Sequence, residues 1–220
     1  IVTGDRGEMF AAAIAAAYMN IPVAHIQAGD VSGHIDGSAR HAITKLSHIH
    51  LASCDDSAKR VINLGEEKWR VFNVGAPQLD FIKNRKKLSR NFLSRKLKID
   101  LKKKTLLCIH HPTLIDTDNA KKEIRILMQS ILQSELQTII IYPNIDSGNE
   151  KIIDEILKIQ NDKIFIFKNL DRDIFIGLLD NITAMIGNSS SGILEAPSFK
   201  LPVVNIGDRQ RGRMQAINVI

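Results

Sequence analysis

The sequence is poor in aromatic residues, cysteine and long apolar runs, and each shortage excludes a class of protein. Phe, Tyr and Trp make up 5% of the 220 residues, too few for the stacking platforms that bind single-stranded nucleic acid. The only cysteines, Cys54 and Cys108, lack paired spacing, so we expect reduced core residues rather than a disulfide or metal ligands. The longest apolar stretch, Met9–Met19, is too short to span a bilayer. We therefore expect a cytoplasmic globular protein without nucleic-acid or membrane partners.

Basic charge is concentrated in one segment. The chain has 30 Lys and Arg against 24 Asp and Glu, and eleven of the basic residues fall in Lys83–Lys104 beside a single acid, Asp100. A nucleic-acid or membrane-surface patch is one interpretation of such a run. A solvated helix that connects two domains is the more frequent one, and we prefer it.

Strand-like apolar runs alternate with helical patterns on both sides of this basic segment. In the first half we expect strands at Ile1–Thr3, Pro22–Gln27, Ile49–Ser53 and Val71–Gly75, and helices at Glu8–Met19, Ser38–Ser47 and Ser57–Leu64. In the second half we expect strands at Leu106–Ile109, Thr138–Tyr142, Ile164–Phe167, Ile182–Ile186 and Pro202–Ile206, and helices at Ala120–Ser134, Glu150–Gln160 and Asp171–Asp180.

This alternation predicts an α/β protein with parallel βαβ units in two Rossmann-like domains. We place the C-terminal portion of the first domain at 1–82, a basic linker at 83–104 and a truncated nucleotide-binding second domain at 105–220. Because a strand tail at the start runs directly into Gly4 and Asp5, we expect that the N-terminal part of the first domain is missing. Ligands of such sheets bind beyond the carboxyl ends of the strands.

A serine-rich turn follows the expected strand Ile182–Ile186. Ser189 and Ser190 stand between two glycines and lead into a short helical pattern, where backbone N–H groups and hydroxyls are available as donors. Arg213 and two further arginines follow the next strand. These are the parts of a phosphate or diphosphate site. A helix cap with solvated arginines is the alternative, and the residues alone leave both open.

These motifs resemble a known family. GNSSSG, the following EAP and NIGDRQRGR are similar to the hydrolysing UDP-N-acetylglucosamine 2-epimerases of sialic and related nonulosonic acid biosynthesis. The similarity continues in GDRGEM, HIQAGDVSGHIDGSARHAITKLSHIH, HHPT and YPNIDSGN, in order and over nearly the whole chain. It implies a glycosyltransferase-B-like fold with the active site in the cleft, a UDP-sugar substrate, no cofactor and a homo-oligomer, either a dimer or a tetramer.

The resemblance assigns the reacting groups to the first half. It makes Asp5 of the GDR turn catalytic, although a helix cap is its simpler role. It makes Asp36 an acid/base candidate and places Arg40 and His41 in the cleft, whereas an i,i+4 ion pair between Asp36 and Arg40 is the alternative. The histidines around His41 fit no tetrahedral zinc spacing, so we expect no metal.

Gln27 departs from the family pattern. Some relatives place a glutamate and others a histidine at this catalytic position, and glutamine hydrogen-bonds but does not titrate. Either proton transfer falls on Asp5, Asp36 or nearby Asp30, or the activity is altered.

The resemblance assigns nucleotide contacts to the second half. It implies that His111 touches the diphosphate, where a cationic imidazole would offset charge on the leaving group. It places Asn144 and Ser147 near the nucleotide and Glu195 on the ribose hydroxyls, and we add the diphosphate ligands Ser189, Ser190 and Arg213. The simpler alternatives are that Asn144 and Ser147 only form a turn and that Glu195 is a solvated helix residue.

The implied reaction converts UDP-GlcNAc to N-acetylmannosamine and UDP by elimination to 2-acetamidoglucal and hydration. Three alternatives stay open: the same chemistry on a UDP- or GDP-linked diacetamido-trideoxy sugar, a non-hydrolysing 2-epimerase, and an inactive module that binds a nucleotide sugar. Gln27 is what raises the last of these.

Overall fold

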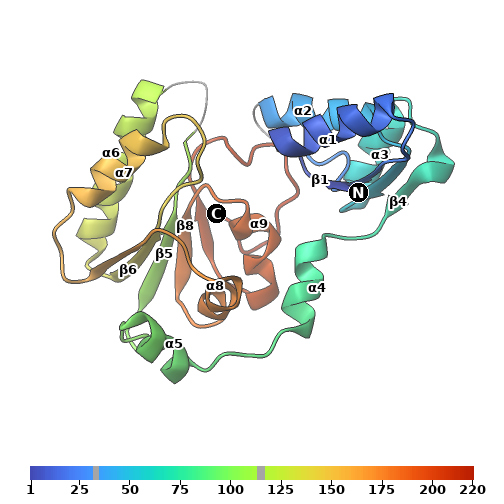
Figure 1. Cartoon of the computed structure of the whole chain (residues 1–220). Coiled ribbons are helices and arrows are strands. Elements are labelled where there is room, and N and C mark those ends of the chain that lie inside the picture. The colour runs from blue at the N-terminus through green and yellow to red at the C-terminus, as the bar shows by residue number, and fades with distance from the viewer. Residues whose placement is uncertain (32–34, 113–116) are drawn as a thin grey trace. The chain divides into compact units, whose positions relative to one another are not determined.

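The computed structural model describes residues 1–31, 35–112 and 117–220, which form two compact units (Figure 1). The first contains Ile1–Phe81 and Arg211–Arg213, and the second contains Ile82–Gln210 and Met214–Ile220. Part of the predicted loop Ala28–Asp36 and Thr113 of the HHPT motif lie outside the described residues.

The first unit is built on a parallel sheet of the order β1-β2-β3-β4. Its elements are β1 (Val2–Thr3), α1 (Gly7–Tyr18), β2 (Ala24–Ile26), α2 (Ile35–Lys45), β3 (Ile49–Ala52), α3 (Asp55–Asn63), the 3₁₀ turn η1 (Lys68–Arg70) and β4 (Val71–Asn73). Helix α1 is rich in alanine, which has the highest helix propensity. It ends before Asn20, which has a left-handed φ of 55°, and before Pro22, which cannot continue a helix. A small core of Val2, Ala13, Val23 and Ile43 joins α1 and α2 to the sheet.

The second unit is built on a parallel sheet of the order β7-β6-β5-β8-β9. Helix α4 (Pro77–Asn84) precedes it, and its elements are α5 (Arg90–Leu97), β5 (Thr105–Ile109), α6 (Thr117–Ser134), β6 (Gln137–Ile141), α7 (Asn149–Leu157), β7 (Ile164–Phe167), α8 (Arg172–Leu179), β8 (Ala184–Gly187), α9 (Ser191–Leu194), the 3₁₀ turn η2 (Ala196–Phe199) and β9 (Val203–Asn205).

Both faces of this second sheet are covered, which explains why its strands read as continuous apolar runs. Alternate residues of one strand enter different cores: Leu107 of β5 packs with the residues of α8, while its neighbour Cys108 packs with those of α6 and α7. Figure 1 shows α6 and α7 on one side of the sheet and α8 and α9 on the other. The carboxyl ends of all five strands therefore share one edge, and their loops form the candidate site.

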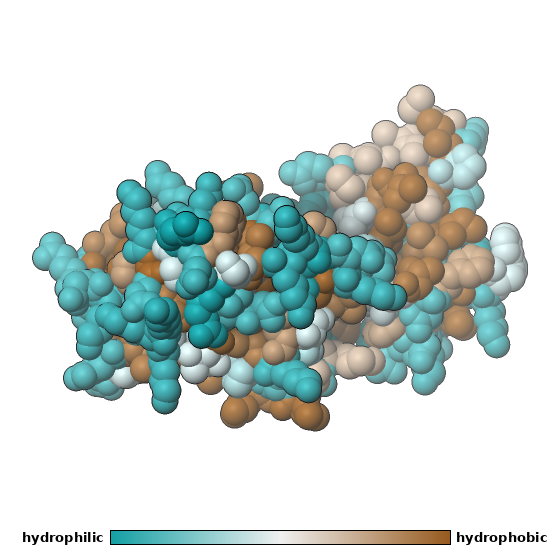
Figure 2. All heavy atoms as spheres, turned by 90° about the horizontal axis from the view of Figure 1, so that it is seen from below, coloured by the Kyte–Doolittle hydropathy of each residue, from teal (hydrophilic) through white to brown (hydrophobic). Residues whose placement is uncertain are grey.

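The basic segment is more than a solvated connector. Its apolar residues Leu93, Leu97, Ile99 and Leu101 are buried in the core of the second unit, and Ser89 caps α5 by accepting a hydrogen bond from Phe92 N at 3.2 Å. The lysines remain exposed, as predicted, and the face that carries α5 is mainly hydrophilic (Figure 2). The leucines are spaced four residues apart, so they align on one side of α5 and anchor it.

The predicted α/β class with two parallel Rossmann-like sheets is confirmed. The predicted strands correspond to β1 to β9 with shifts of a few residues at their ends, where hydrogen bonding rather than hydrophobicity sets the limit. Among the described residues, no helix combines the length and the hydrophobicity that a membrane crossing requires.

Candidate active site

In the first unit the predicted residues Asp5, Gln27 and Arg40 lie together. Asp5 follows β1, Gln27 follows β2 and Arg40 comes from α2. The buried Arg40 guanidinium pairs with the Asp5 carboxylate through Nη2 and donates from Nη1 to the Gln27 carbonyl at 3.0 Å. The structure thus brings a carboxylate, an amide side chain and a fixed cation to one edge of the sheet.

Gln27 has an unusual backbone. Its φ of 63° lies in the left-handed region, which is uncommon for residues other than glycine, asparagine and aspartate. Its N–H donates to the Leu51 carbonyl at 2.8 Å, so the conformation is held by β3 on one side and by Arg40 on the other. Strain of this kind accumulates at functional sites because the surroundings must hold it in place.

Asp30, which the sequence leaves between a turn former and a proton carrier, is buried. Its Oδ1 accepts hydrogen bonds from the hydroxyls of Ser53 and Ser57, the latter at 2.7 Å, and its Oδ2 lies 3.9 Å from Arg40 Nη1. The carboxylate therefore belongs to the same polar network as Asp5, with Arg40 between the two.

Asp36 and His41 belong to α2. Asp36 is half-buried in the first turn, one helical turn before Arg40. His41 is half-buried, and burial together with Arg60 and Arg40 lowers the pKa of its imidazole. Its buried Nδ1 has no hydrogen-bond partner among the described residues.

In the second unit His111 and Asn144 meet at the ends of β5 and β6. The Asn144 backbone N–H donates to His111 Nδ1 at 3.0 Å, and burial beside Arg209 lowers the pKa of His111 to about 3. The ring is therefore neutral, with its proton on Nε2. The predicted cationic imidazole is wrong for this geometry, and the group that His111 offers is a neutral N–H donor.

Asn188, which was not among the predicted site residues, connects β8 to β5. Its Oδ1 accepts from His111 N at 2.7 Å and its Nδ2 donates to His111 O at 2.9 Å. The Gln210 side chain donates to the Asn188 carbonyl at 2.7 Å. In the sequence, the position of Asn188 within the GNSSSG motif was the only indication of this bridging role.

This approach of β8 to β5 requires Gly187. Its φ is 131°, and a Cβ there would lie 2.0 Å from the Ile109 carbonyl oxygen. The glycine lets the serine turn start at the edge of the sheet beside His111.

The serine turn leads into a short helix, as predicted. Helix α9 has four residues, so its dipole contributes little, and the hydroxyls are what remain. Ser189 and Ser191 exchange a hydrogen bond at 2.8 Å, and both line a cavity that Ser190 does not line. Glu195 is buried and pairs with Arg172 of α8, which also lines the cavity.

The cavity has a volume of about 520 Å³, within the range of small-molecule sites. It lies wholly in the second unit at the carboxyl ends of β5 to β8. The apolar side chains that line it are Ile109, Ile141, Tyr142, Pro143, Leu170 and Phe175. The polar side chains that line it are His111, Asn144, Lys168, Asn169, Arg172, Ser189 and Ser191. Lys168 and Arg172 were not predicted, because no motif marks them. Exposed Ser147 is not among the lining residues.

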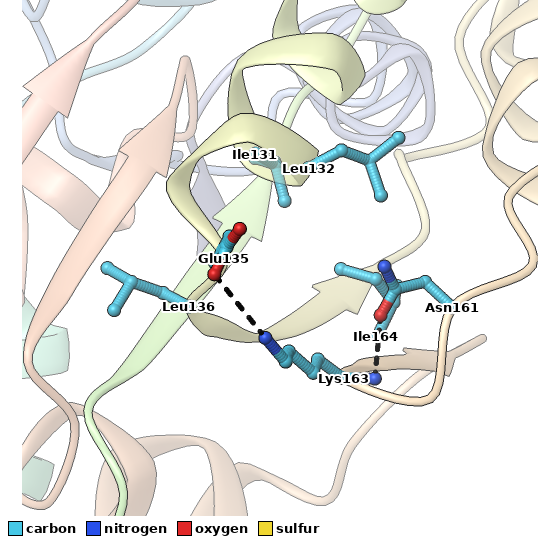
Figure 3. A pocket seen from close by; sticks show the side chains of 7 residues that line it. All are labelled: Ile131, Leu132, Glu135, Leu136, Asn161, Lys163 and Ile164. Carbon is cyan, nitrogen blue, oxygen red and sulfur yellow. Dashed lines mark hydrogen bonds and ion pairs between the residues drawn. The ribbon is translucent and has the colours of Figure 1, made fainter.

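A second hollow of about 220 Å³ lies at the other end of the strands (Figure 3). Glu135 and Lys163 face each other across it at 4.0 Å, beside apolar side chains from the end of α6. The amino ends of parallel strands rarely hold ligands, so we assign no role to this hollow.

The predicted residues fall in two sets. Asp5, Gln27, Asp36, Arg40, His41 and Arg213 belong to the first unit, and His111, Asn144, Ser147, Ser189, Ser190 and Glu195 belong to the second. The common diphosphate site of Ser190 and Arg213 stays a prediction.

Comparison with known proteins gives the sequence relatives first. The chain is 44% identical over 221 residues to UDP-N,N'-diacetylbacillosamine 2-epimerase (hydrolyzing) of Legionella pneumophila, covering 100% of this chain and 59% of that one. It is 38% identical over 225 residues to GDP/UDP-N,N'-diacetylbacillosamine 2-epimerase (hydrolyzing) of Campylobacter jejuni, with the same coverage of 100% and 59%. It is 32% identical over 220 residues to UDP-N-acetylglucosamine 2-epimerase of Neisseria meningitidis, covering 100% and 58%. The chain thus spans 58–59% of the length of these relatives.

Solved structures show the same fold. The UDP-GlcNAc 2-epimerase of Neisseria meningitidis bound to UDP-GlcNAc has a TM-score of 0.75 at 21% identity, covering 96% of this chain and 60% of that one. The Methanocaldococcus jannaschii UDP-GlcNAc 2-epimerase in complex with UDP-GlcNAc and UDP has a TM-score of 0.72 at 19% identity, covering 94% and 59%. A match to the UDP-N-acetylglucosamine 2-epimerase family extends over residues 1–220, and the chain belongs to that family.

Proposed function

We propose that this chain carries the catalytic core of a hydrolysing 2-epimerase that acts on a UDP-linked 2-acetamido sugar, with UDP-N,N'-diacetylbacillosamine as the first substrate to test. The observation that carries the reaction is the Asp5–Arg40–Gln27 cluster in a chain of this family. The sugar is chosen on identity: the two diacetylbacillosamine relatives, at 44% and 38%, exceed the UDP-N-acetylglucosamine relative at 32%. The sequence motifs favour UDP-GlcNAc as the substrate and keep a diacetamido-trideoxy sugar as an alternative, and we now propose that alternative.

In the proposed first step the C1–O bond to UDP breaks, the proton at C2 leaves, and a C1=C2 double bond forms. A carboxylate accepts the C2 proton, and Asp5 and Asp36 are the candidates. Gln27 does not titrate, so its side chain orients substrate by hydrogen bonds. Arg40 holds Asp5 in place, which keeps a general base in a fixed position.

The departing diphosphate acquires negative charge, which donors from the second unit and Arg213 stabilise in our proposal. His111 offers its Nε2–H as a neutral donor, and Ser189 and Ser190 add hydroxyls. The apolar part of the 520 Å³ cavity suits the uracil ring, and Glu195 is assigned to the ribose hydroxyls. In the second step water adds its hydroxyl at C1, and C2 takes a proton on the opposite face.

The test is to incubate the full protein with each UDP-sugar in deuterated water and to identify products by NMR. A free sugar with inverted C2 carrying deuterium, together with UDP, supports the proposal. Turnover of UDP-N,N'-diacetylbacillosamine in preference to UDP-GlcNAc supports the substrate choice. The reverse preference would contradict it and identify UDP-GlcNAc as the substrate.

Two outcomes would contradict the proposal. A UDP-linked epimer as product would identify a non-hydrolysing 2-epimerase. Binding of both UDP-sugars without turnover would indicate a nucleotide-sugar-binding module, the possibility that Gln27 raises. The predicted dimer or tetramer stays a prediction, which light scattering would check.

A further inference from the structure

The geometry points to His25 as a positioning residue that ties the turn carrying Asp5 to helix α2 and thereby fixes Asp5 against Arg40. This inference rests on the proposed function, in which Asp5 and Arg40 belong to the reacting cluster. His25 itself lies inside β2, is fully buried and is not among the residues that line the cavity.

The first tie runs from His25 to the Asp5 turn. His25 Nε2 donates to the carbonyl oxygen of Gly4 at 2.8 Å, and Gly4 N donates to the Ile26 carbonyl at 3.0 Å. Both backbone groups of Gly4 are therefore bonded to β2. Gly4 has a φ of 72°, a conformation that glycine adopts easily and leaves as easily, so these bonds determine where the next residue, Asp5, points.

The second tie runs from His25 to α2. His25 Nδ1 lies 3.1 Å from the hydroxyl of Thr44, which stands one helical turn after Arg40 and also lies 3.0 Å from the Arg40 carbonyl oxygen. The imidazole thus spans from the residue before Asp5 to the helix turn that presents the Arg40 guanidinium. One rigid ring sets the separation between the two partners of the ion pair.

The tautomer follows from the acceptor. A carbonyl oxygen only accepts, so the proton of the neutral ring must be on Nε2, and Nδ1 is left as an acceptor that faces the Thr44 hydroxyl, whose single proton is shared between Nδ1 and the Arg40 carbonyl oxygen. Burial lowers the pKa of His25 to about 4, which keeps the ring neutral near pH 7. The ring therefore donates to one side and accepts from the other, a pattern that no apolar side chain reproduces.

A neighbouring histidine offers a matched control. His50 is paired in register with His25 on β3 and is equally buried, but its Nε2 bonds to Glu66 at 3.0 Å rather than to the Asp5 turn. Replacing His50 should cost stability without moving Asp5. If His25 had only a structural role, replacing it would likewise lower stability without moving Asp5.

The experiment compares His25→Gln, His25→Asn, His25→Leu and His50→Gln in the full protein. The amide of glutamine can replace Nε2–H toward Gly4, whereas asparagine reaches only the Thr44 side and leucine neither. We expect kcat to fall roughly 10- to 100-fold in His25→Leu and His25→Asn, with substantial rescue in His25→Gln and little change in His50→Gln, while UDP affinity stays constant.

A readout without substrate separates this inference from the proposed function. The backbone amide NMR signals of Asp5 and Gln27 should shift in His25→Leu, return toward wild type in His25→Gln and stay in place in His50→Gln. Unmoved signals in folded His25→Leu, or full kcat in that variant, would overturn the positioning role. A wild-type protein without turnover but with the expected shifts would refute the proposed reaction and leave the tie established.

Discussion

Asp36 and Arg40 occupy adjacent turns of α2. Arg40 is buried against Asp5, Asp30 and the Gln27 carbonyl, so its place is determined by charge and by hydrogen bonding. Asp36 is half-buried at the start of the helix, where a carboxylate is stabilised by the helix N-terminus whether or not it reacts.

A substitution separates these two roles of Asp36. Asp36→Asn should abolish turnover of the UDP-sugar and leave UDP affinity near that of the wild type, because an amide keeps the helix start but accepts no proton. Steady-state kinetics and UDP calorimetry measure the two quantities. Asp56→Asn, in the first turn of α3, is the matched control and should change neither. Retained turnover would reduce Asp36 to a helix-start residue.

Three histidines with strongly lowered pKa values make stability depend on pH. Burial lowers the pKa of His25 and His110 from 6.5 to about 4 and that of His111 to about 3. Between pH 6.5 and pH 4 the unfolded chain therefore binds protons on these histidines that the folded chain does not bind. The contribution of the neutral rings to the free energy of unfolding is complete above pH 6.5 and is lost as the pH falls toward 4.

We expect the free energy of unfolding, from urea titrations at pH 7 and pH 5, to fall with pH by up to about 1.4 kcal/mol per unit for each such histidine. His110→Gln should flatten this slope. A free energy that is constant or rises between pH 7 and pH 5 would show that these rings are not held neutral.

At the scale of elements, the close approach of β8 to β5 depends on one glycine. Gly187→Ala should lower the free energy of unfolding by at least about 2 kcal/mol, because the new Cβ would collide with the Ile109 carbonyl and the φ of 131° is unfavourable for alanine. Urea unfolding measures the loss. Gly207→Ala is the control, since φ is also positive at 71° but nothing lies within 4 Å. Equal losses in both variants would attribute the cost to backbone conformation alone.

The elements themselves were largely predictable, for physical reasons that differ along the chain. The strands of the second sheet are buried on both faces, so β5 and β6 contain the apolar runs Leu106–Ile109 and Ile139–Ile141, which stand out from the sequence. The serine turn was read as a helix start, and α9 is four residues long because η2 and Pro197 follow at once. Basic α5 read as a connector because its charges outnumber the leucines that anchor it.

At the scale of the whole molecule, the diphosphate site is the prediction that joins residues of different units. Arg213→Ala should weaken UDP binding by about 2 kcal/mol or more if the guanidinium pairs with a buried phosphate. A double-mutant cycle with Ser190→Ala tests whether both residues contact the same group, since shared contacts give a coupling of about 0.5–3 kcal/mol.

Calorimetry with UDP supplies the four affinities of the cycle. Exposed Lys102→Ala, outside the predicted phosphate motifs, is the control for general loss of positive charge. Additive effects of Ser190→Ala and Arg213→Ala would place the two residues on separate groups, and an unchanged affinity in Arg213→Ala would remove Arg213 from the site.

The sequence alone determined the α/β class, the parallel direction of the strands and the family, because apolar periodicity and ordered motifs are local properties of the chain, whereas the order of the strands in each sheet came from the structure. It did not determine the protonation of His111, the bridging role of Asn188 or the ties made by His25. Those depend on burial and on partners far away in sequence: Asn188 lies 77 residues from His111, and His25 lies 21 from Gly4. Only the folded sheets bring such groups within hydrogen-bond distance and remove the water that would otherwise set their charge.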